Sequence, residues 1–307
     1  MRKAANVARP ISFAALAGAN LERTVSLGGG GLFFIAWLSS YLLALRDGGV
    51  DLALAERVVG TSAGSVVGAS LCAGRVDRLH TKMSLLAKTP ATLSARLLNA
   101  EQSPSQARAA ELAFYATDAE EATVHAIGYA ALGVTSSSAR AMKAGMGFLL
   151  GTRRWPSSVL ETTCVDAYSA ERCVITADDE VPLLDAVAAS CSVPGFAAPQ
   201  RIGDRLCMDG GMIGTGVHLD RVAGAGRALV IALDGAKGLP DSGLTIASGA
   251  AAAERAALEA SGTQVLHLSP EQAETGTLMA PSSIPAALEM GARQGQADVG
   301  RVRAFWR

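Results

Sequence analysis

The hydrophobic and polar positions near the start of the chain predict a short strand followed by a buried helix. Arg23 to Leu27 is a β-rich run that leads directly into four glycines. Phe33 to Arg46 carries apolar residues on every side, which is typical of a helix surrounded by core, and Asp47, Gly48 and Gly49 end it. We expect a strand, a glycine loop and a buried helix in succession.

A second strand, turn and helix follow. Arg57 to Val59 predicts a short strand, and Gly60-Thr-Ser-Ala-Gly64 turns it into an apolar helix over Ser65 to Ala73, which Gly74 ends. A strand that turns sharply into a helix is the context in which a nucleophilic serine is presented. The central residue of this turn, Ser62, is therefore a candidate nucleophile.

The middle of the chain, from Arg75 to Arg154, is Ala-rich and predicted to be largely helical. Asp118 is the expected N-cap of a helix over Ala119 to Leu132, and Gly133 is its expected stop. Large apolar residues at the end of this stretch favour core packing over an acyl-chain pocket. These residues are Met142, Met146, Phe148, Leu149 and Leu150.

Strands return in the second half of the chain. The predicted strands are Leu160 to Asp166, Glu171 to Thr176, Arg205 to Met208, Ala228 to Leu233 and Gln264 to Leu268. Pro285 to Val302 predicts a closing helix. Strands and helices mixed in this order favour a single α/β sandwich over separate domains.

Charge and cysteine content exclude several classes of protein. With 27 Lys and Arg against 28 Asp and Glu, the net charge of -1 provides no field for nucleic acid. The five cysteines are widely spread and include no Cys-x-x-Cys pair, which predicts buried reduced thiols; none lies in an elbow typical of a nucleophile. No metal-ligand spacing is present, so neither a metal nor a cofactor is expected. The cysteines are Cys72, Cys164, Cys173, Cys191 and Cys207.

Two segments have features of membrane or export sequences. Val25 to Leu45 is nearly uncharged and as long as a spanning helix, but its four glycines disfavour a continuous helix. Met1 to Ala19 places basic residues before the apolar stretch Ile11 to Ala17, which is short and interrupted. We expect no transmembrane span and a cytoplasmic location, with peripheral membrane contact or export as the open alternatives.

The glycine run Gly28 to Gly31 precedes the candidate nucleophile. Backbone N–H groups of a glycine loop at a helix N-terminus can converge on an anion, as an oxyanion hole requires. A plain tight turn or a phosphate loop is the alternative. No Gly-Lys-Ser/Thr follows, and Phe33 stands where a dinucleotide fingerprint starting at Gly28 needs its last glycine, so both nucleotide motifs fail.

Three blocks of the sequence together resemble the patatin-like phospholipase family. Ser26-Leu-Gly-Gly-Gly-Gly31 is similar to the family's oxyanion loop, and Gly60-Thr-Ser-Ala-Gly64 to its nucleophile elbow. The third block is Ala189-Ser-Cys-Ser-Val-Pro-Gly-Phe196, followed by Pro199 and by Cys207-Met-Asp-Gly-Gly211. Their order and spacing match the family, which is far more specific than any one block.

The resemblance implies a fold and an activity. The fold would be a three-layer α/β/α sandwich, patatin-like and lysophospholipase-like, in one domain over residues 23–303 after an N-terminal extension of residues 1–22. The activity would be that of a serine lipid acyl hydrolase of phospholipase A, lysophospholipase or carboxylesterase type. Its substrate would be a lipid or other acyl ester.

The resemblance also implies the residues that act. Ser62 and Asp209 would form a catalytic dyad without histidine, and the oxyanion would be bound by backbone N–H groups. An aspartate with an ordinary pKa near 3.9 is a weak base, so partial burial has to raise its pKa and positioning has to supply much of the rate. The oxyanion loop would be Gly28, Gly29, Gly30 and Gly31, and the supporting motif glycines Gly60, Gly64, Gly210 and Gly211.

One departure from the family pattern leaves alternatives open. The family has Arg or Lys and then Gly after its glycine run, whereas this chain has Leu32 and Phe33. The missing cation removes charge assistance near an oxyanion or lipid phosphate but leaves the backbone donors. A neutral ester substrate, a slower enzyme and a non-catalytic lipid-binding relative are each compatible with it.

Two other enzymes fit parts of the pattern. An α/β-hydrolase would use a triad of Ser62, Asp234 and His267, in the chain order of that fold, but would leave the Asp209 block unexplained. An acyl transferase of related architecture would pass the acyl group to an alcohol or thiol instead of water.

Overall fold

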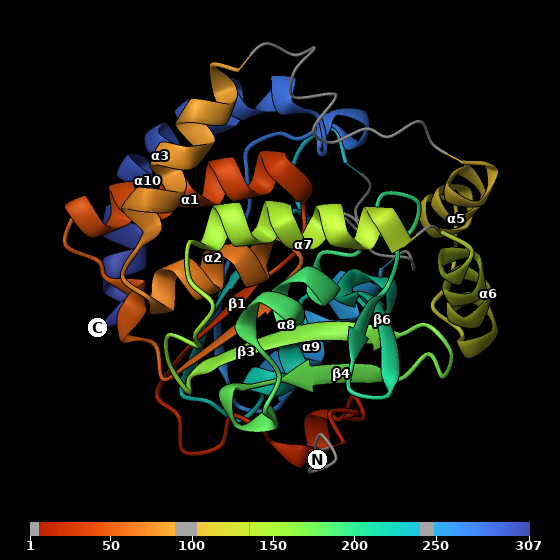
Figure 1. The fold of residues 1–307 in the computed structure, drawn as a ribbon. Helices are drawn as coiled ribbons and strands as arrows, with labels where there is room; N and C mark the ends of the chain where they lie inside the picture. The colour runs from red at the N-terminus through yellow and green to blue at the C-terminus, as the bar shows by residue number, and fades with distance from the viewer. Residues whose placement is uncertain (1–5, 90–102, 135, 240–248) are drawn as a thin grey trace.

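The computed structural model describes residues 6–89, 103–134, 136–239 and 249–307. In these ranges eight strands form one mixed sheet whose two faces are both covered by helices, the expected three-layer α/β/α arrangement (Figure 1). The strands are β1 (Arg23–Leu27), β2 (Arg57–Thr61), β3 (Leu160–Asp166), β4 (Arg172–Ile175), β5 (Gln200–Ile202), β6 (Arg205–Asp209), β7 (Arg227–Ile231) and β8 (Gln264–Leu268). The α-helices are α1 (Gly31–Asp47), α2 (Ala63–Cys72), α3 (Val76–Ala87), α5 (Pro104–Phe114), α6 (Glu121–Leu132), α7 (Ser136–Leu150), α8 (Leu183–Ser190), α9 (Ala250–Ala260) and α10 (Ile284–Trp306).

The centre of the sheet is parallel. Strands β3, β2, β1, β7 and β8 are neighbours in that order and run in the same direction. Leu27, the last residue of β1, lies beside Gly60 of β2. Because the carboxyl ends of parallel strands share one edge of the sheet, the glycine loop after β1 and the turn after β2 emerge side by side.

The antiparallel strands are arranged around β3. Strand β4 pairs with β3 from Thr162 to Val165 and occupies one of its edges, so β2 and β6 must share the other edge. There β2 pairs as far as Thr163, and β6 pairs from Cys164, which lies opposite Asp209. The carboxyl ends of β2 and β6 therefore meet, and the residues at these ends are brought together.

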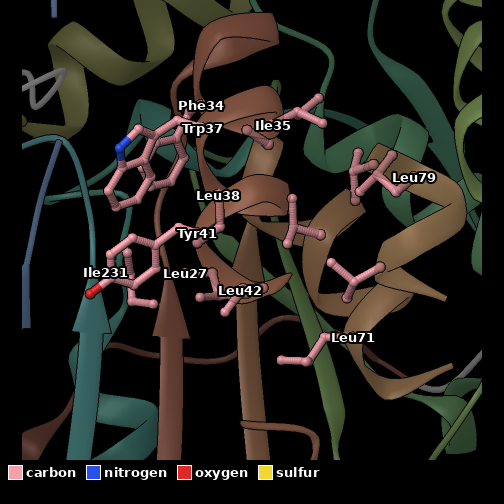
Figure 2. Packing of buried hydrophobic residues seen from close by; sticks show 14 of the residues in the cluster. Leu27, Phe34, Ile35, Trp37, Leu38, Tyr41, Leu42, Leu71, Leu79 and Ile231 are labelled. Carbon is pink, nitrogen blue, oxygen red and sulfur yellow. The ribbon is translucent and has the colours of Figure 1, made fainter. Parts of the chain in front are cut away.

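The largest buried cluster lies between one face of the sheet and helices α1, α2, α3 and α10. Figure 2 shows Tyr41 of α1 beside Leu27 and Ile231 of the sheet, and its ring stacks on Trp37 at 4.7 Å between centroids. A Cβ added to Gly291 of α10 would lie 2.1 Å from the carbonyl oxygen of Trp37. Glycine at that position allows α1 and α10 to approach closely.

The large apolar residues at the end of the middle stretch of the chain differ in burial. Leu149 and Leu150 are buried, and Met142 and Met146 pack against the largest core cluster, as expected. Phe148 instead is 48% exposed, so its assignment to the core is wrong.

Strands β1, β3 and β8 have the predicted bounds. Helix α6 begins at Glu121 with Glu120 as N-cap, so the predicted cap at Asp118 is wrong. The Asp118 carboxylate instead accepts hydrogen bonds from the Glu120 N–H at 3.1 Å and the Thr123 hydroxyl at 2.5 Å. The short elements α8 and β5 and the Ala-rich helix α9 have no counterpart in the prediction.

The apolar stretch Val25–Leu45 contains the end of β1, the glycine loop and most of α1, which has 17 residues. Within the described ranges, no helix has both the length and the apolarity needed to cross a bilayer.

Candidate active site

The glycine loop and the Ser62 turn pack backbone against backbone. The Gly64 N–H donates to the carbonyl oxygen of Gly28 at 3.0 Å. A Cβ added to Gly64 would lie 2.1 Å from the Leu27 oxygen, and one added to Gly60 would lie 2.6 Å from the Gly64 oxygen. Glycine at positions 60 and 64 is therefore required for this approach.

Ser62 lies at the tip of the turn between β2 and α2. Its φ of 53° and ψ of -120° are unusual for a residue other than glycine, and such a conformation costs about 1–3 kcal/mol. The Ser62 carbonyl accepts the Ser65 N–H at 2.9 Å, which begins the helix. A strained serine between a strand and a helix has the geometry of a nucleophile elbow.

The glycine loop faces Ser62 directly. A Cβ added to Gly29 would lie 3.3 Å from the Ser62 Cβ and 3.8 Å from its Oγ. The N–H groups of Gly29 and Gly30 donate to no atom of the described residues, so they are open to an oxyanion. Gly28 is also predicted to donate to the oxyanion. Its N–H instead donates to the Ile231 oxygen at 2.9 Å and extends the sheet.

Asp209 ends β6 at the junction with β2 and is only 3% exposed. Its Oδ1 accepts the Gly211 N–H at 2.8 Å, while its buried Oδ2 accepts no hydrogen bond of regular geometry from the described residues. Burial raises the pKa of Asp209 to about 6, and the nearby Ser62 hydroxyl and the Gly211 N–H partly oppose that rise. The structure therefore brings together a serine hydroxyl and a buried carboxylate of increased basicity.

The segment Ser190 to Ser192, at the end of α8, bonds to both Ser62 and Asp209. The Ser190 hydroxyl oxygen accepts the Ser62 N–H at 2.9 Å, and the Cys191 thiol donates to the Ser62 carbonyl at 3.3 Å. The next residue, Ser192, accepts the Asp209 N–H through its carbonyl at 2.9 Å. This Ser-Cys-Ser segment is part of the third sequence block, but the sequence alone does not indicate that it joins the other two.

The Gly210 carbonyl is held by a buried polar network that sequence reasoning missed. His218 Nε2 lies 3.0 Å from the Gly210 oxygen, and its Nδ1 lies 3.4 Å from an Arg172 nitrogen. Arg172 also forms a two-point ion pair with Asp220. Burial and the charge of Arg172 lower the pKa of His218 to about 3, so the ring is neutral and donates through Nε2. The network positions the turn that follows Asp209.

A family model described as patatin-like phospholipase matches residues 25–217, a range that includes the glycine loop, Ser62 and Asp209. The chain belongs to the patatin-like phospholipase family. Members of this family are generally lipid-ester hydrolases. No curated protein sequence matches the chain.

Two solved structures are similar to this patatin-like chain. The crystal structure of VipD from Legionella pneumophila has a TM-score of 0.45 at 13% identity and covers 98% of this chain, which spans 72% of VipD. The type III effector protein ExoU has a TM-score of 0.38 at 15% identity and covers 92% of this chain, which spans 53% of ExoU.

The position of the missing family cation is apolar. Leu32 is partly buried against the largest core cluster. Next to it, the Phe33 N–H donates to the Leu278 oxygen at 3.0 Å, and a Cβ added to Gly31 would lie 2.5 Å from the Met279 sulfur. The outer side of the glycine loop is thus covered by apolar chain.

The alternative triad does not form in this structure. His267 Nε2 lies 3.1 Å from Asp234 Oδ1, so the histidine and aspartate do pair. However, β1 and β7 lie between β2 and β8, and three strand spacings separate His267 from Ser62 by roughly 14 Å. The pair is also bound by Arg255, which contacts the other Asp234 oxygen. The Ser62-Asp234-His267 arrangement is therefore wrong.

Three of the cysteines form a cluster that their spacing in the sequence does not indicate. The sulfur atoms of Cys164, Cys173 and Cys207 lie within 4.8 Å of one another, and all three side chains are buried. They come from β3, β4 and β6, which pair only in the folded sheet. All five cysteines are free thiols. Among the described residues, this cluster is the set of donors that fits a soft metal ion.

Proposed function

We propose that the protein is a serine lipid acyl hydrolase in which Ser62 is the nucleophile and Asp209 its base. The observation that carries this proposal is the buried Asp209 carboxylate beside a serine in an elbow conformation, with an open oxygen and a raised pKa. Membership of the patatin-like phospholipase family supports an ester of a lipid as substrate.

The chemistry follows from the arrangement of these groups. The Asp209 carboxylate takes the proton of the Ser62 hydroxyl as Oγ attacks the ester carbonyl carbon. The carbonyl oxygen becomes an oxyanion, which the N–H groups of Gly29 and Gly30 stabilise. Collapse of this intermediate expels the alcohol, which takes the proton from Asp209, and leaves an acyl-serine. Water then attacks the acyl-serine with Asp209 again as the base, and the fatty acid leaves as the Ser62 oxygen takes the proton back from Asp209.

Rigid positioning contributes to the rate. The Ser190 to Ser192 segment bonds to both members of the dyad, so their separation is set by one short piece of chain. His218 holds the carbonyl of Gly210 and so limits movement of the turn next to the carboxylate. A weak base that is held in place can still act, because orientation lowers the entropic part of the barrier.

Covalent labelling tests the proposal. A fluorophosphonate probe should label the wild-type protein, and Ser62→Ala should abolish both labelling and hydrolysis of a nitrophenyl ester. Ser70→Ala is the matched control, because Ser70 lies on the same helix and only bonds to the Val66 carbonyl. Hydrolysis by Ser62→Ala at the wild-type rate would refute the mechanism, and an acyl acceptor other than water would identify an acyl transferase. Activity should persist in the presence of a chelator.

A further inference from the structure

A cavity of about 670 Å³ lies between α7 and α8, apart from the Ser62 site. Its lining includes three basic side chains, Arg140, Lys143 and Arg153, and no acidic side chain. Lys143 is paired with Asp185 at the rim. Arg140 and Arg153 form no ion pair or hydrogen bond with the described residues. The cavity therefore presents two guanidinium groups whose charge is not compensated. A guanidinium can donate two hydrogen bonds to the oxygens of one phosphate.

The charge of the surrounding surface is segregated, although the net charge of the chain is -1. Between residues 139 and 158 the sequence has four basic residues and no acidic one. Helix α3 adds Lys82, which donates to the Phe148 and Leu149 carbonyls at the end of α7. Burial lowers the pKa of Lys82, and the charges of Arg78 and Arg75 lower it further, so these cations lie near one another. The four basic residues are Arg140, Lys143, Arg153 and Arg154.

Exposed apolar side chains lie beside Lys82, whose Nζ would be 2.9 Å from a Cβ added to Gly151 in the cavity lining. Phe148 is 48% exposed, and the Lys82 Nζ lies 5.5 Å from the centre of its ring. Leu85 is 61% exposed and is one helical turn from Lys82 on α3, so it shares that face. Cations together with exposed large apolar residues are typical of surfaces that bind the interface of a bilayer, whereas a nucleic-acid surface does not need the apolar part.

We propose that this surface docks the protein on a bilayer containing anionic phospholipid, with a head-group phosphate between Arg140 and Arg153. The role of this docking, the delivery of lipid substrate, rests on the proposed function. The binding itself requires no turnover. Helix α7 lies alongside α2, the helix that Ser62 caps, so the docking surface and the nucleophile belong to the same helical layer (Figure 1).

Vesicle sedimentation tests the docking. Wild-type protein should sediment with phosphatidylcholine vesicles that contain phosphatidylserine, should bind pure phosphatidylcholine vesicles weakly, and should be released by salt. Arg140→Gln combined with Arg153→Gln should weaken binding on the order of thirtyfold. Arg108→Gln with Arg301→Gln removes the same charge from exposed residues of other helices and should change binding little. Each double variant should keep the wild-type melting temperature and nitrophenyl ester hydrolysis.

The outcomes separate this proposal from the proposed function. Equal binding by wild type and the Arg140/Arg153 variant, or no binding to anionic vesicles, would overturn the docking surface. If Phe148→Ser left vesicle binding unchanged, an acidic protein surface would be the better partner and the bilayer proposal would fall. Anionic vesicle binding without any ester hydrolysis would overturn the proposed function and leave the docking surface standing.

Discussion

Two buried aspartates at the carboxyl side of the sheet have opposite surroundings. Asp209, at the end of β6, accepts the Gly211 N–H and pairs with no Lys or Arg among the described residues. Asp234, after β7, contacts both Arg255 and His267. Burial without a cation disfavours the carboxylate and raises the pKa of Asp209, whereas the carboxylate of Asp234 faces the Arg255 guanidinium.

The contrast shows which aspartate is suited to act as a base. A carboxylate in an ion pair has its charge already compensated and gains little by taking a proton. One that is buried without a cation gains more by taking a proton, which is what a base for a serine hydroxyl needs. A nearby histidine is therefore no sign of catalysis in this chain, because His267 is joined to the compensated aspartate.

The largest effect expected is on turnover by Asp209→Asn. The amide cannot accept the Ser62 proton, so kcat for a nitrophenyl ester should fall on the order of a thousandfold. The matched control is Asp234→Asn, which should keep kcat within a few-fold of wild type because Asp234 follows β7, two strand spacings from β2. The comparison breaks down if the two variants lose activity equally.

Asp209→Asn should also raise the stability of the folded protein at high pH. Because the pKa of Asp209 rises from 3.8 to about 6 on folding, the folded state holds more protons than the unfolded state between these values, and stability falls as pH rises through them. The buried charge thus costs up to about 3 kcal/mol above pH 6 and nothing below pH 4. In thermal unfolding, Asp209→Asn should exceed wild type at pH 8 and match it near pH 4; a destabilised variant at pH 8 would contradict this.

Gly29→Ala should reduce turnover by roughly a hundredfold, since the new Cβ would lie 3.3 Å from the Ser62 Cβ and displace the loop whose N–H groups face the oxyanion. Gly145→Ala on α7 is the control, because a Cβ there meets no atom within 4 Å. Steady-state kinetics measure the turnover of both variants, and their melting temperatures show whether both are folded. An active Gly29→Ala variant would exclude this loop as the oxyanion site.

Activity should depend on the ionised form of Asp209. Because its pKa is about 6, kcat/KM should be level above pH 7 and fall about tenfold for each pH unit below 6. A pH profile of nitrophenyl ester hydrolysis gives the inflection. An inflection near pH 4 would mean that burial does not raise the pKa of the Asp209 carboxylate in solution.

The smallest effect is expected for His267→Ala. Its kcat should stay within about twofold of wild type, and the inflection of its pH profile should not move, because His267 belongs to the Asp234 pair. A collapse of activity in this variant, measured on the same ester, would restore the histidine to the mechanism and overturn the comparison.

The sequence alone determined the local parts of this protein. Short β-rich runs placed β1, β3 and β8 at their observed bounds, and the Gly60 to Gly64 motif identified the elbow, because each depends on neighbours along the chain. The match of three blocks to a family then supplied the fold and the Asp209 hypothesis. Periodicity failed where elements were short, as for α8 and β5.

Only the tertiary structure decided which distant groups share a site. β2 and β6 meet along one edge of β3, and this places Asp209 by Ser62; β1 and β7 keep His267 away, and a bond to the Ile231 carbonyl occupies the N–H of Gly28. The pKa of Asp209 likewise depends on what covers it. Strand neighbours and burial are set by packing between residues far apart in sequence, so no local pattern encodes them.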